Sequence, residues 1–510
     1  MLRSSARMRR RDFLRWSGLG AAGLAAGSLL PRLGRSGANE GAWGDYPASA
    51  ASAALPAAKL AKNVLEVFVL GGLCPWETFY AVDRDDWGKS DGRMWFTFQD
   101  GPDGVPAWYA KCGFSGPLLQ PFRTDENGVM VNLGPFAEPL RSRKDIVARL
   151  RLHVMSHDLF PHPPARILAS MGATGGSPRL AGLGCAVQHH AITHAAAPSP
   201  LPYAYGINAG ITDLIGLHPS WARPLQLTFA PQDGKLPSAF QFAHSSPYAS
   251  PAAEALAKRW YADYAARLTW PGALARVRSA TLDNYDVADQ QFDRLGNVAN
   301  VVSPSEFAAT PGNFCGAEYT ADNTRIQLRL AAHLLTHPGS VARYVTVHDQ
   351  GYADTDLADA YDFHTDYVRR GSARMTHLWS ELIAILNEPG ENDPTKLNLD
   401  ETLVVVTSEF GRDPLPQGVN GGRNHYPGAY VTLMFGGPIG PDQQGIVGAI
   451  DNSASPVDAL RPAETRAAIL AALGIWPFEM ESFAFGDIGP ATSELDAATR
   501  LKEVVLGVTS

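Results

Sequence analysis

The chain has few cysteines and no long apolar run in its main body, and both shortages limit what it can be. Four of its 510 residues are cysteine, and Cys74, Cys112, Cys185 and Cys315 lie too far apart for a zinc-finger or haem-attachment motif. Their spacing does not show whether they form disulfides. Beyond residue 30, no apolar stretch is long enough to cross a bilayer, so we expect no stable membrane span.

Positive charge is also scarce. The formal net charge of −8 argues against nucleic acid or an anionic membrane as a partner. One dinucleotide-like fingerprint, Gly18-x-Gly20-x-x-Gly23, follows a basic tail rather than a strand, which argues against a nucleotide cofactor. With 45% hydrophobic residues, the chain can nevertheless bury a large core.

The N-terminus carries an export signature. The motif Arg10-Arg11-Asp12-Phe13-Leu14-Arg15 precedes a weakly apolar, Gly- and Ala-rich run at residues 17–30. This order is typical of a twin-arginine signal, which we assign to residues 1–38. It predicts the twin-arginine translocase as a partner during export and a periplasmic or extracellular location. An ordinary basic amphipathic N-terminus is the alternative.

The rest of the chain alternates between strand and helix patterns. Residues 39–62 are rich in Ala, Pro and Ser and are predicted to form a linker. Residues 63–510 are predicted to form an α/β domain with an irregular insertion around 201–310. Helical periodicity occurs at 324–335, 367–386 and 462–473. The predicted buried strands are Val64–Leu70, Leu150–Met155, Tyr344–Val347, Thr402–Val406 and Tyr430–Phe435. This alternation favours a mainly parallel sheet covered by helices on both faces.

Polar side chains flank these predicted strands, at the kind of edge where open α/β sheets bind ligands. Carboxylates and imidazoles from several strand ends are what a one- or two-metal hydrolytic site needs, together with an arginine that neutralises developing negative charge. The candidate metal ligands are Glu77, Asp362, His364, Glu409 and His425, with His162 as a further candidate.

Each acid among them also has a plainer interpretation. Glu409 ends a buried strand, where an unpartnered carboxylate is costly, so we expect a metal ion or Arg412 beside it rather than solvent. For Glu77, an ion pair with a nearby arginine is an equal alternative. Asp362 and His364 lie in an acidic neighbourhood, for which a solvated loop is the alternative.

The remaining candidates rest on position. For His425, the alternative is a core histidine that is hydrogen-bonded to the backbone. For His162, the alternative is an incidental position in a proline-rich turn. Ser156 and Thr78 are the candidate nucleophiles, although neither lies in a motif that activates a hydroxyl. Arg412 is the candidate anion clamp, because its guanidinium group suits phosphate or sulfate.

Several of these residues lie in longer motifs that carry a family resemblance. Ser408-Glu409-Phe410-Gly411-Arg412 is followed by Gly422-Arg423-Asn424-His425, and both come after Tyr361-Asp362-Phe363-His364. Near the start, Gly71-Gly72 precedes Glu77-Thr78. From about Leu65 to Leu473, the chain resembles the sulfatase-like, exported bacterial proteins called domain of unknown function 1501, within the alkaline phosphatase superfamily.

This resemblance implies an alkaline-phosphatase-like α/β fold and a site for one or two divalent ions. Zinc is favoured, with manganese or calcium as alternatives. By the superfamily's order, Glu77 resembles the first acid, Asp362 and His364 the central pair, Glu409 the later acid and His425 the last histidine. The family usually has Asp at the position of Glu77 and also before the last histidine, where this chain has asparagine.

We therefore expect an exported metal-dependent hydrolase that acts on a phosphate or sulfate ester, in a small molecule or a polymer. The alternative is a non-catalytic envelope protein that retains the fold for binding or assembly. The two departures from the family pattern and the absence of a nucleophile motif favour this alternative.

Overall fold

The computed structural model describes residues 42–83, 104–174, 181–197, 199–209, 221, 223–229, 250–268, 297–353, 360–417 and 422–509. The predicted signal at residues 1–38 and the fingerprint at Gly18–Gly23 lie outside these residues. Trp43–Ser510 form one unit, to which the described helices and strands belong.

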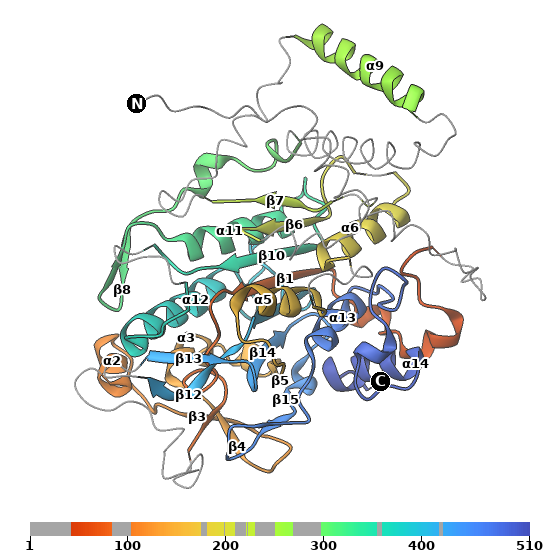
Figure 1. Ribbon diagram of the computed structural model, residues 1–510. Helices are drawn as coiled ribbons and strands as arrows, with labels where there is room; N and C mark the ends of the chain where they lie inside the picture. Colours follow the sequence, from red (N-terminus) through yellow and green to blue (C-terminus); the bar gives the residue numbers. More distant parts are fainter. Residues whose placement is uncertain are drawn as a thin grey trace, which may run out of the picture. The chain divides into compact units, whose positions relative to one another are not determined.

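An eight-stranded sheet lies at the centre of the described structure, in the order β15-β5-β14-β11-β1-β10-β6-β7 (Figure 1). Its strands are β1 Asn63–Val69, β5 Arg151–Met155, β6 Ala204–Ile207, β7 Leu225–Leu227, β10 Tyr344–Asp349, β11 Thr402–Ser408, β14 Tyr430–Phe435 and β15 Gly445–Val447. Neighbours are parallel, except that β14 runs antiparallel to β11 and β5. The predicted mainly parallel sheet and its five predicted strands are therefore confirmed.

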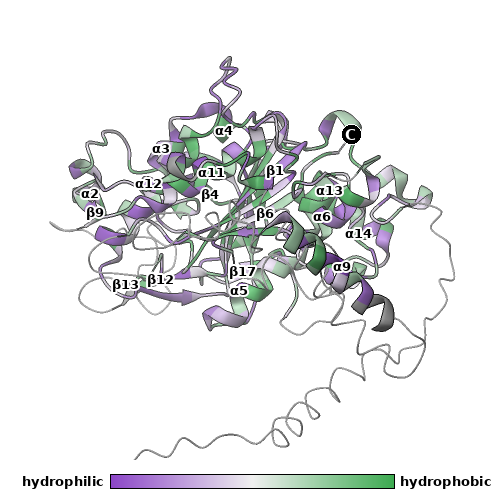
Figure 2. Ribbon diagram, turned by 90° about the horizontal axis from the view of Figure 1, so that it is seen from above, coloured by the Kyte–Doolittle hydropathy of each residue, from purple (hydrophilic) through white to green (hydrophobic). Residues whose placement is uncertain are grey.

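The strands are buried on both faces, and their side chains alternate between two hydrophobic cores. In β11, Val404 and Val406 belong to one core, whereas Leu403 and Val405 belong to the other. Strands covered on both faces are apolar throughout, which explains the continuous apolar runs in the sequence. Figure 2 shows the apolar residues gathered along the central strands and the helices beside them.

Helices cover both faces, as predicted. The first core includes side chains of α2 Val105–Lys111, α3 Glu138–Arg141, α4 Lys144–Val147, α11 Asn323–Thr336 and α12 Ser372–Ala384. The second core includes side chains of α5 His162–Met171, α6 Leu183–His194, α13 Pro462–Ala472 and α14 Glu494–Arg500. A π-helical turn, η7 at Tyr367–Gly371, leads into α12. One further helix, α9, spans Pro251–Leu268.

The direction of β14 decides where its flanking residues lie. β1, β10 and β11 run the same way, so the residues that follow them meet at one edge of the sheet. Because β14 runs the other way, the residues that precede it reach this edge. Gly436 and Gly437, which follow β14, lie instead beside Thr402 and Leu403 at the start of β11.

A hairpin between β11 and β14 completes this edge. It consists of β12 Gly411–Gln417 and β13 Gly422–Tyr426, and its register places Arg412 opposite His425. The other strands form small antiparallel sheets: β2 Ala81–Val82, β3 Gln120–Thr124 and β4 Met130–Leu133; β8 Gly312–Phe314 and β9 Ala317–Tyr319; β16 Ala449–Ile450 and β17 Pro456–Val457.

Two segments differ from the expectations. Residues 42–62, predicted as a linker, pack onto the domain: they form the 3-10 helices η2 Ala48–Ala53 and η3 Ala57–Lys59, and Ala50 and Leu55 are buried in the second core. Within the predicted insertion at 201–310, β6 and β7 extend the main sheet. Most of that stretch, including residues 210–220, 230–249 and 269–296, lies outside the described residues.

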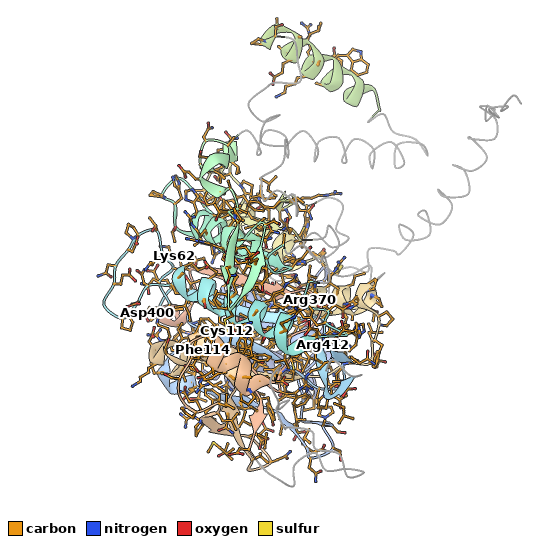
Figure 3. All side chains as sticks on the ribbon, turned by 90° about the vertical axis from the view of Figure 1, so that its left-hand side faces the viewer. Lys62, Cys112, Phe114, Arg370, Asp400 and Arg412 are labelled. Atoms are coloured by element: carbon orange, nitrogen blue, oxygen red, sulfur yellow. A yellow bond between two sulfur atoms is a disulfide. The ribbon has the colours of Figure 1, made fainter. Side chains whose placement is uncertain are left out.

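A disulfide joins Cys112, at the end of α2, to Cys315, in the turn between β8 and β9 (Figure 3). Cys74 and Cys185 are free and buried. The sequence had left the pairing open, because contact between such distant segments is decided by the fold. Among the described helices, none combines the length and the apolar character that crossing a bilayer requires.

Candidate metal centre

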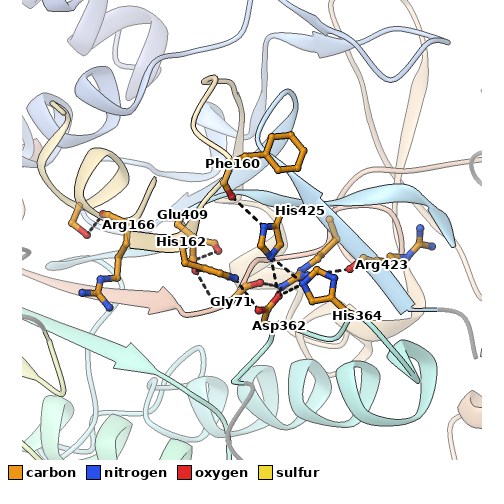
Figure 4. A network of polar contacts seen from close by, with 12 residues as sticks. Gly71, Phe160, His162, Arg166, Asp362, His364, Glu409, Arg423 and His425 are labelled. Carbon is orange, nitrogen blue, oxygen red and sulfur yellow. Dashed lines mark hydrogen bonds and ion pairs between the residues drawn. The ribbon is translucent and has the colours of Figure 1, made fainter. Parts of the chain in front are cut away.

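Five polar side chains meet beyond the carboxyl end of β11 (Figure 4). They are His162 at the start of α5, Asp362 and His364 from the loop before η7, Glu409 directly after β11, and His425 on β13. All five were candidates from the sequence, and they come from segments up to 263 positions apart, since 425 − 162 = 263. The fold brings them together because β1, β10 and β11 end at one edge and β14 begins there.

Asp362 lies at the centre of the cluster. Its Oδ1 is 3.0 Å from His364 Nε2 and 3.1 Å from His425 Nε2, and these two nitrogens are 3.1 Å apart. Its Oδ2 is 2.8 Å from His162 Nε2. Ligand atoms around one tetrahedral zinc ion lie about 3.3 Å apart, given bonds of about 2.0–2.1 Å. The spacing of these side chains therefore suits a metal ion.

The ring of His425 shows why a cation belongs there. Its Nδ1 lies 3.1 Å from the carbonyl oxygen of Phe160, and because that oxygen can only accept, Nδ1 carries the hydrogen. In a neutral ring, Nε2 would then present a lone pair to Asp362 Oδ1 and to His364 Nε2. A proton or a metal ion between these groups relieves the repulsion. Histidines that bind metals are commonly oriented by an Nδ1–H bond to a carbonyl group.

Glu409 acts on the cluster through His162. Its Oε1 accepts from His162 Nδ1 at 2.7 Å and from the Gly71 N–H at 2.8 Å, while the Ser408 hydroxyl donates to Oε2 at 3.1 Å. With Nδ1–H donated to Glu409, Nε2 of His162 faces Asp362, and it would offer its lone pair to an ion bound there. Glu409 was predicted as a ligand, but its contacts are those of a residue that orients one.

Protons hold the same groups together when no metal ion is bound. Burial alone would lower the pKa of His162, but its hydrogen bonds with Asp362 and Glu409 raise that pKa to about 9. Burial raises the pKa of Asp362, yet hydrogen bonds with His162 and His425 and the charge of Arg412 bring it well below its usual range. His162 is therefore an imidazolium at neutral pH, and a bound divalent ion would replace its Nε2 proton.

Arg412 holds Asp362 from the buried side. Its Nη2 donates to Asp362 Oδ1 at 2.5 Å and to the Gly71 carbonyl oxygen, and its Nη1 donates to the carbonyl oxygen of Arg423 at 3.0 Å. The side chain of Arg412 is fully buried, whereas that of His364 is 43% exposed. The predicted anion clamp thus lies where it orients Asp362, and the cluster opens to solvent on the side of His364.

Glu77 is placed apart from these five residues. Its carboxylate forms a buried ion pair with Arg423 and accepts a hydrogen bond from the Cys74 thiol at 2.9 Å. Burial lowers the pKa of Arg423, but the charge of Glu77 outweighs this and keeps the pKa above its ordinary value. The ion pair considered from the sequence is the interaction that the structure shows.

The two predicted nucleophiles have other surroundings. Thr78 is completely buried, and its hydroxyl donates to the carbonyl oxygen of Cys74. Ser156 follows β5 and is partly buried, and its N–H donates to the carbonyl oxygen of Leu460 at 3.1 Å. Among the described residues, the hydroxyl that contacts the cluster is that of Ser408, which is buried and donates to Glu409.

From the sequence, His162 was only a further candidate ligand after His364 and His425, although it contacts both acids of the cluster. The available signal was its place at the start of a helix after Pro161, where the proline-rich backbone fixes the position of the ring. The role of Phe160 was missed because a backbone carbonyl leaves no mark in the sequence. Its ring, 50% exposed, extends beside His425 (Figure 4).

The fold and the cluster define a mixed α/β protein with a histidine–carboxylate site at the carboxyl edge of a mostly parallel sheet. The chain belongs to the family described as "Protein of unknown function (DUF1501)", whose model matches residues 61–488. This match contains every residue of the cluster. No curated protein and no solved structure matches the chain.

Proposed function

We propose that the protein is an exported, metal-dependent hydrolase of phosphate or sulfate esters, with a fold like that of the alkaline phosphatase superfamily. The observation that carries this proposal is the approach of two imidazole Nε2 atoms, from His364 and His425, to one oxygen of Asp362 at 3.0–3.1 Å. When bound there, a divalent ion supplies Lewis-acid chemistry: it polarises an ester oxygen and lowers the pKa of water.

The protein's own residues hold and orient the ligands. His162, Asp362 and His425 each offer a ligand atom within 4.8 Å of the other two, and His364 joins them on the exposed side. An imidazole-rich set with one carboxylate favours zinc over calcium or manganese, which prefer oxygen ligands. The carboxylate of Glu409 fixes the ring of His162.

Substrate reaches the site from the side of His364, where solvent contacts the cluster. Because the hydroxyls of Thr78 and Ser408 are buried and already donate hydrogen bonds, water is the nucleophile in this proposal. The exposed ring of Phe160 forms an apolar rim beside His425 and accommodates the organic part of an ester.

Export is supported by two independent features. The first is the arginine pair within residues 1–38, and the second is the disulfide between Cys112 and Cys315. Disulfides persist in oxidising compartments such as the periplasm and are rare in the cytosol. A cell fractionation in which the protein stays in the cytosol with both cysteines reduced would contradict this part of the proposal.

The hydrolase proposal is tested by metal analysis of the purified protein and by assays on a panel of phosphate monoesters, phosphate diesters and sulfate esters. We expect a zinc ion at this centre, and turnover that a chelator removes and zinc restores. Asp362→Asn should lose turnover and the zinc ion held at this centre. Asp366→Asn is the matched control, because Asp366 lies four positions away, pairs with exposed Arg369 and has a left-handed φ that asparagine tolerates.

A non-catalytic role remains as a second candidate because Arg412, the predicted anion clamp, is sealed from solvent. In that case metal would stabilise the fold without turnover. Zinc that raises the melting temperature of the parent chain, with every ester left intact, would favour this second candidate and refute the hydrolase.

A further inference from the structure

A second group of histidine and carboxylate side chains lies elsewhere on the domain. Asp45, His190 and His194 each offer one ligand atom within 4.8 Å of the other two. The histidines are one turn apart on α6 and therefore share a face of the helix, while Asp45 belongs to the segment before β1. We propose that these residues form a second metal site, which binds a divalent transition-metal ion such as zinc and clips residues 43–46 to α6.

His194 is the first argument for this site, since both of its ring nitrogens face acceptors. Nδ1 lies 2.8 Å from the carbonyl oxygen of His190 and so carries the hydrogen. Nε2 then presents a lone pair to Asp45 Oδ1 at only 2.9 Å. As at His425, a proton or a metal ion between the two groups relieves the repulsion, and the carbonyl bond orients the ring as in known metal sites.

His190 is the second argument. It is only 9% exposed, and its Nδ1 has no hydrogen-bond partner among the described residues. The rings of His190 and His194 stack with centroids 3.9 Å apart, which brings the two potential ligands side by side.

The segment that carries Asp45 is already held in place. The Gly44 N–H donates to Glu479 Oε1 at 3.0 Å, and its carbonyl oxygen accepts from the Trp476 N–H at 2.7 Å. Gly44 has a φ of +83°, and a Cβ at this position would lie 2.7 Å from Cδ2 of His190. Glycine thus allows the backbone to lie against the ring, and Asp45 is positioned before any ion binds.

A third histidine–carboxylate group, Asp322, His377 and Glu381, does not carry the same argument. Asp322 Oδ1 accepts from the Arg325 N–H at 3.0 Å and from His377 Nε2 at 2.9 Å, so it caps α11. The guanidinium group of Arg325 also lies 3.7 Å from Glu381. Hydrogen bonds and an arginine therefore account for the positions of these carboxylates without a metal ion.

The test uses the full chain with zinc as the probe. In the Asp362→Asn variant, which lacks the first centre, we expect about one zinc ion per chain after dialysis against submicromolar zinc. Adding His194→Gln or Asp45→Asn should weaken the remaining site at least about 100-fold. His189→Gln is the matched control, because His189 is the neighbouring residue on α6 but is not one of the three proposed ligands: its ring stacks on Trp221 and packs edge-on against Trp43.

The same variants in the parent chain keep the test valid if Asp362→Asn does not fold. There, His194→Gln should remove about one zinc ion per chain relative to His189→Gln. Cobalt in place of zinc provides a second readout, as a visible absorption band that depends on His194. Equal zinc content in His194→Gln and His189→Gln, or weakening by less than tenfold, would overturn the second site, whatever the result at Asp362.

Discussion

Two acids near the same sheet edge, Asp362 and Glu77, have opposite surroundings. Each pairs with an arginine from the same hairpin: Asp362 with Arg412 on β12, and Glu77 with Arg423 on β13. Glu77 is sealed, with 2% of its side chain exposed, and shares its surroundings with a thiol. Asp362 is 27% exposed and contacts imidazole nitrogens as well.

This comparison shows what separates a structural acid from a candidate ligand. A buried carboxylate that has a guanidinium partner to itself is neutralised, and a metal ion would have to displace that partner. Arg412 neutralises only one oxygen of Asp362 and leaves three imidazole nitrogens directed at the same group. Solvent access on the side of His364 then lets an ion enter.

The largest expected effect is that of replacing Asp362, the partly exposed acid. Asp362→Asn should abolish zinc binding at this centre and, with it, stabilisation on the order of 10 kcal/mol, the range of structural zinc sites. The reason is that the amide is a poor ligand at the point where the histidines converge. Isothermal titration of the chelated protein with zinc measures this loss. A variant that binds as many zinc ions as the parent, with the same affinities, would remove Asp362 from the site.

Replacement of Glu77, the buried acid, should have the next largest effect, and this effect should be on folding alone. Glu77→Gln leaves Arg423 buried without a counter-charge, which should lower the free energy of unfolding by about 3–5 kcal/mol. Urea denaturation measures the loss, and zinc content of the folded fraction should stay unchanged. If zinc content falls together with stability, Glu77 is part of the metal site and the comparison fails.

An intermediate effect is expected at Glu409, which shares features with both Glu77 and Asp362. Glu409 is sealed like Glu77 but bonds to a candidate ligand, so Glu409→Gln should weaken zinc binding about 10- to 100-fold without abolishing it. The glutamine keeps the shape but loses the charge that steadies His162. Competition with a calibrated chelator measures the affinity. Unchanged affinity would show that the orientation of His162 does not depend on Glu409.

The last prediction concerns pH, where the change per pH unit is small, and it contrasts His162 with a histidine that has no acid beside it. His153 in β5 is fully buried, and burial, with the charge of Arg151, lowers its pKa to about 3. Its neutral form is favoured in the folded state, so it favours folding above pH 6.5, and this contribution is lost as pH falls toward 3. The loss is about 1.4 kcal/mol per pH unit.

The pKa of His162 is raised to about 9 instead, so in metal-free protein its contribution is complete below pH 6.5 and is lost as pH rises toward 9. His153→Asn should therefore flatten the acid side of the stability curve and leave the alkaline side unchanged. Urea denaturation of chelated protein from pH 4 to 9 measures both. An unchanged acid slope in the variant would contradict the assignment of a neutral His153.

Much of the fold could be predicted, because its strands and helices follow from local hydrophobic patterns in the sequence. Five apolar runs became β1, β5, β10, β11 and β14, and three helical periods became α11, α12 with its preceding turn, and α13. The last two strands at one end of the sheet, β6 and β7, were not predicted, since they are short and their pattern is weak. The linker prediction was based on composition, but alanines can also pack closely, as Ala50 and Ala53 do.

The sequence by itself determined which residue types stand near the ends of the central strands, and hence that acids and imidazoles would gather at one edge. Only the tertiary structure decided their partners: it sealed Glu77 with Arg423, aimed the rings of His162 and His425 at Asp362, and set Glu409 behind His162. The physical reason is that strand order, the reversed direction of β14 and the hairpin register set side-chain distances of about 3 Å, and no local pattern in the chain encodes them.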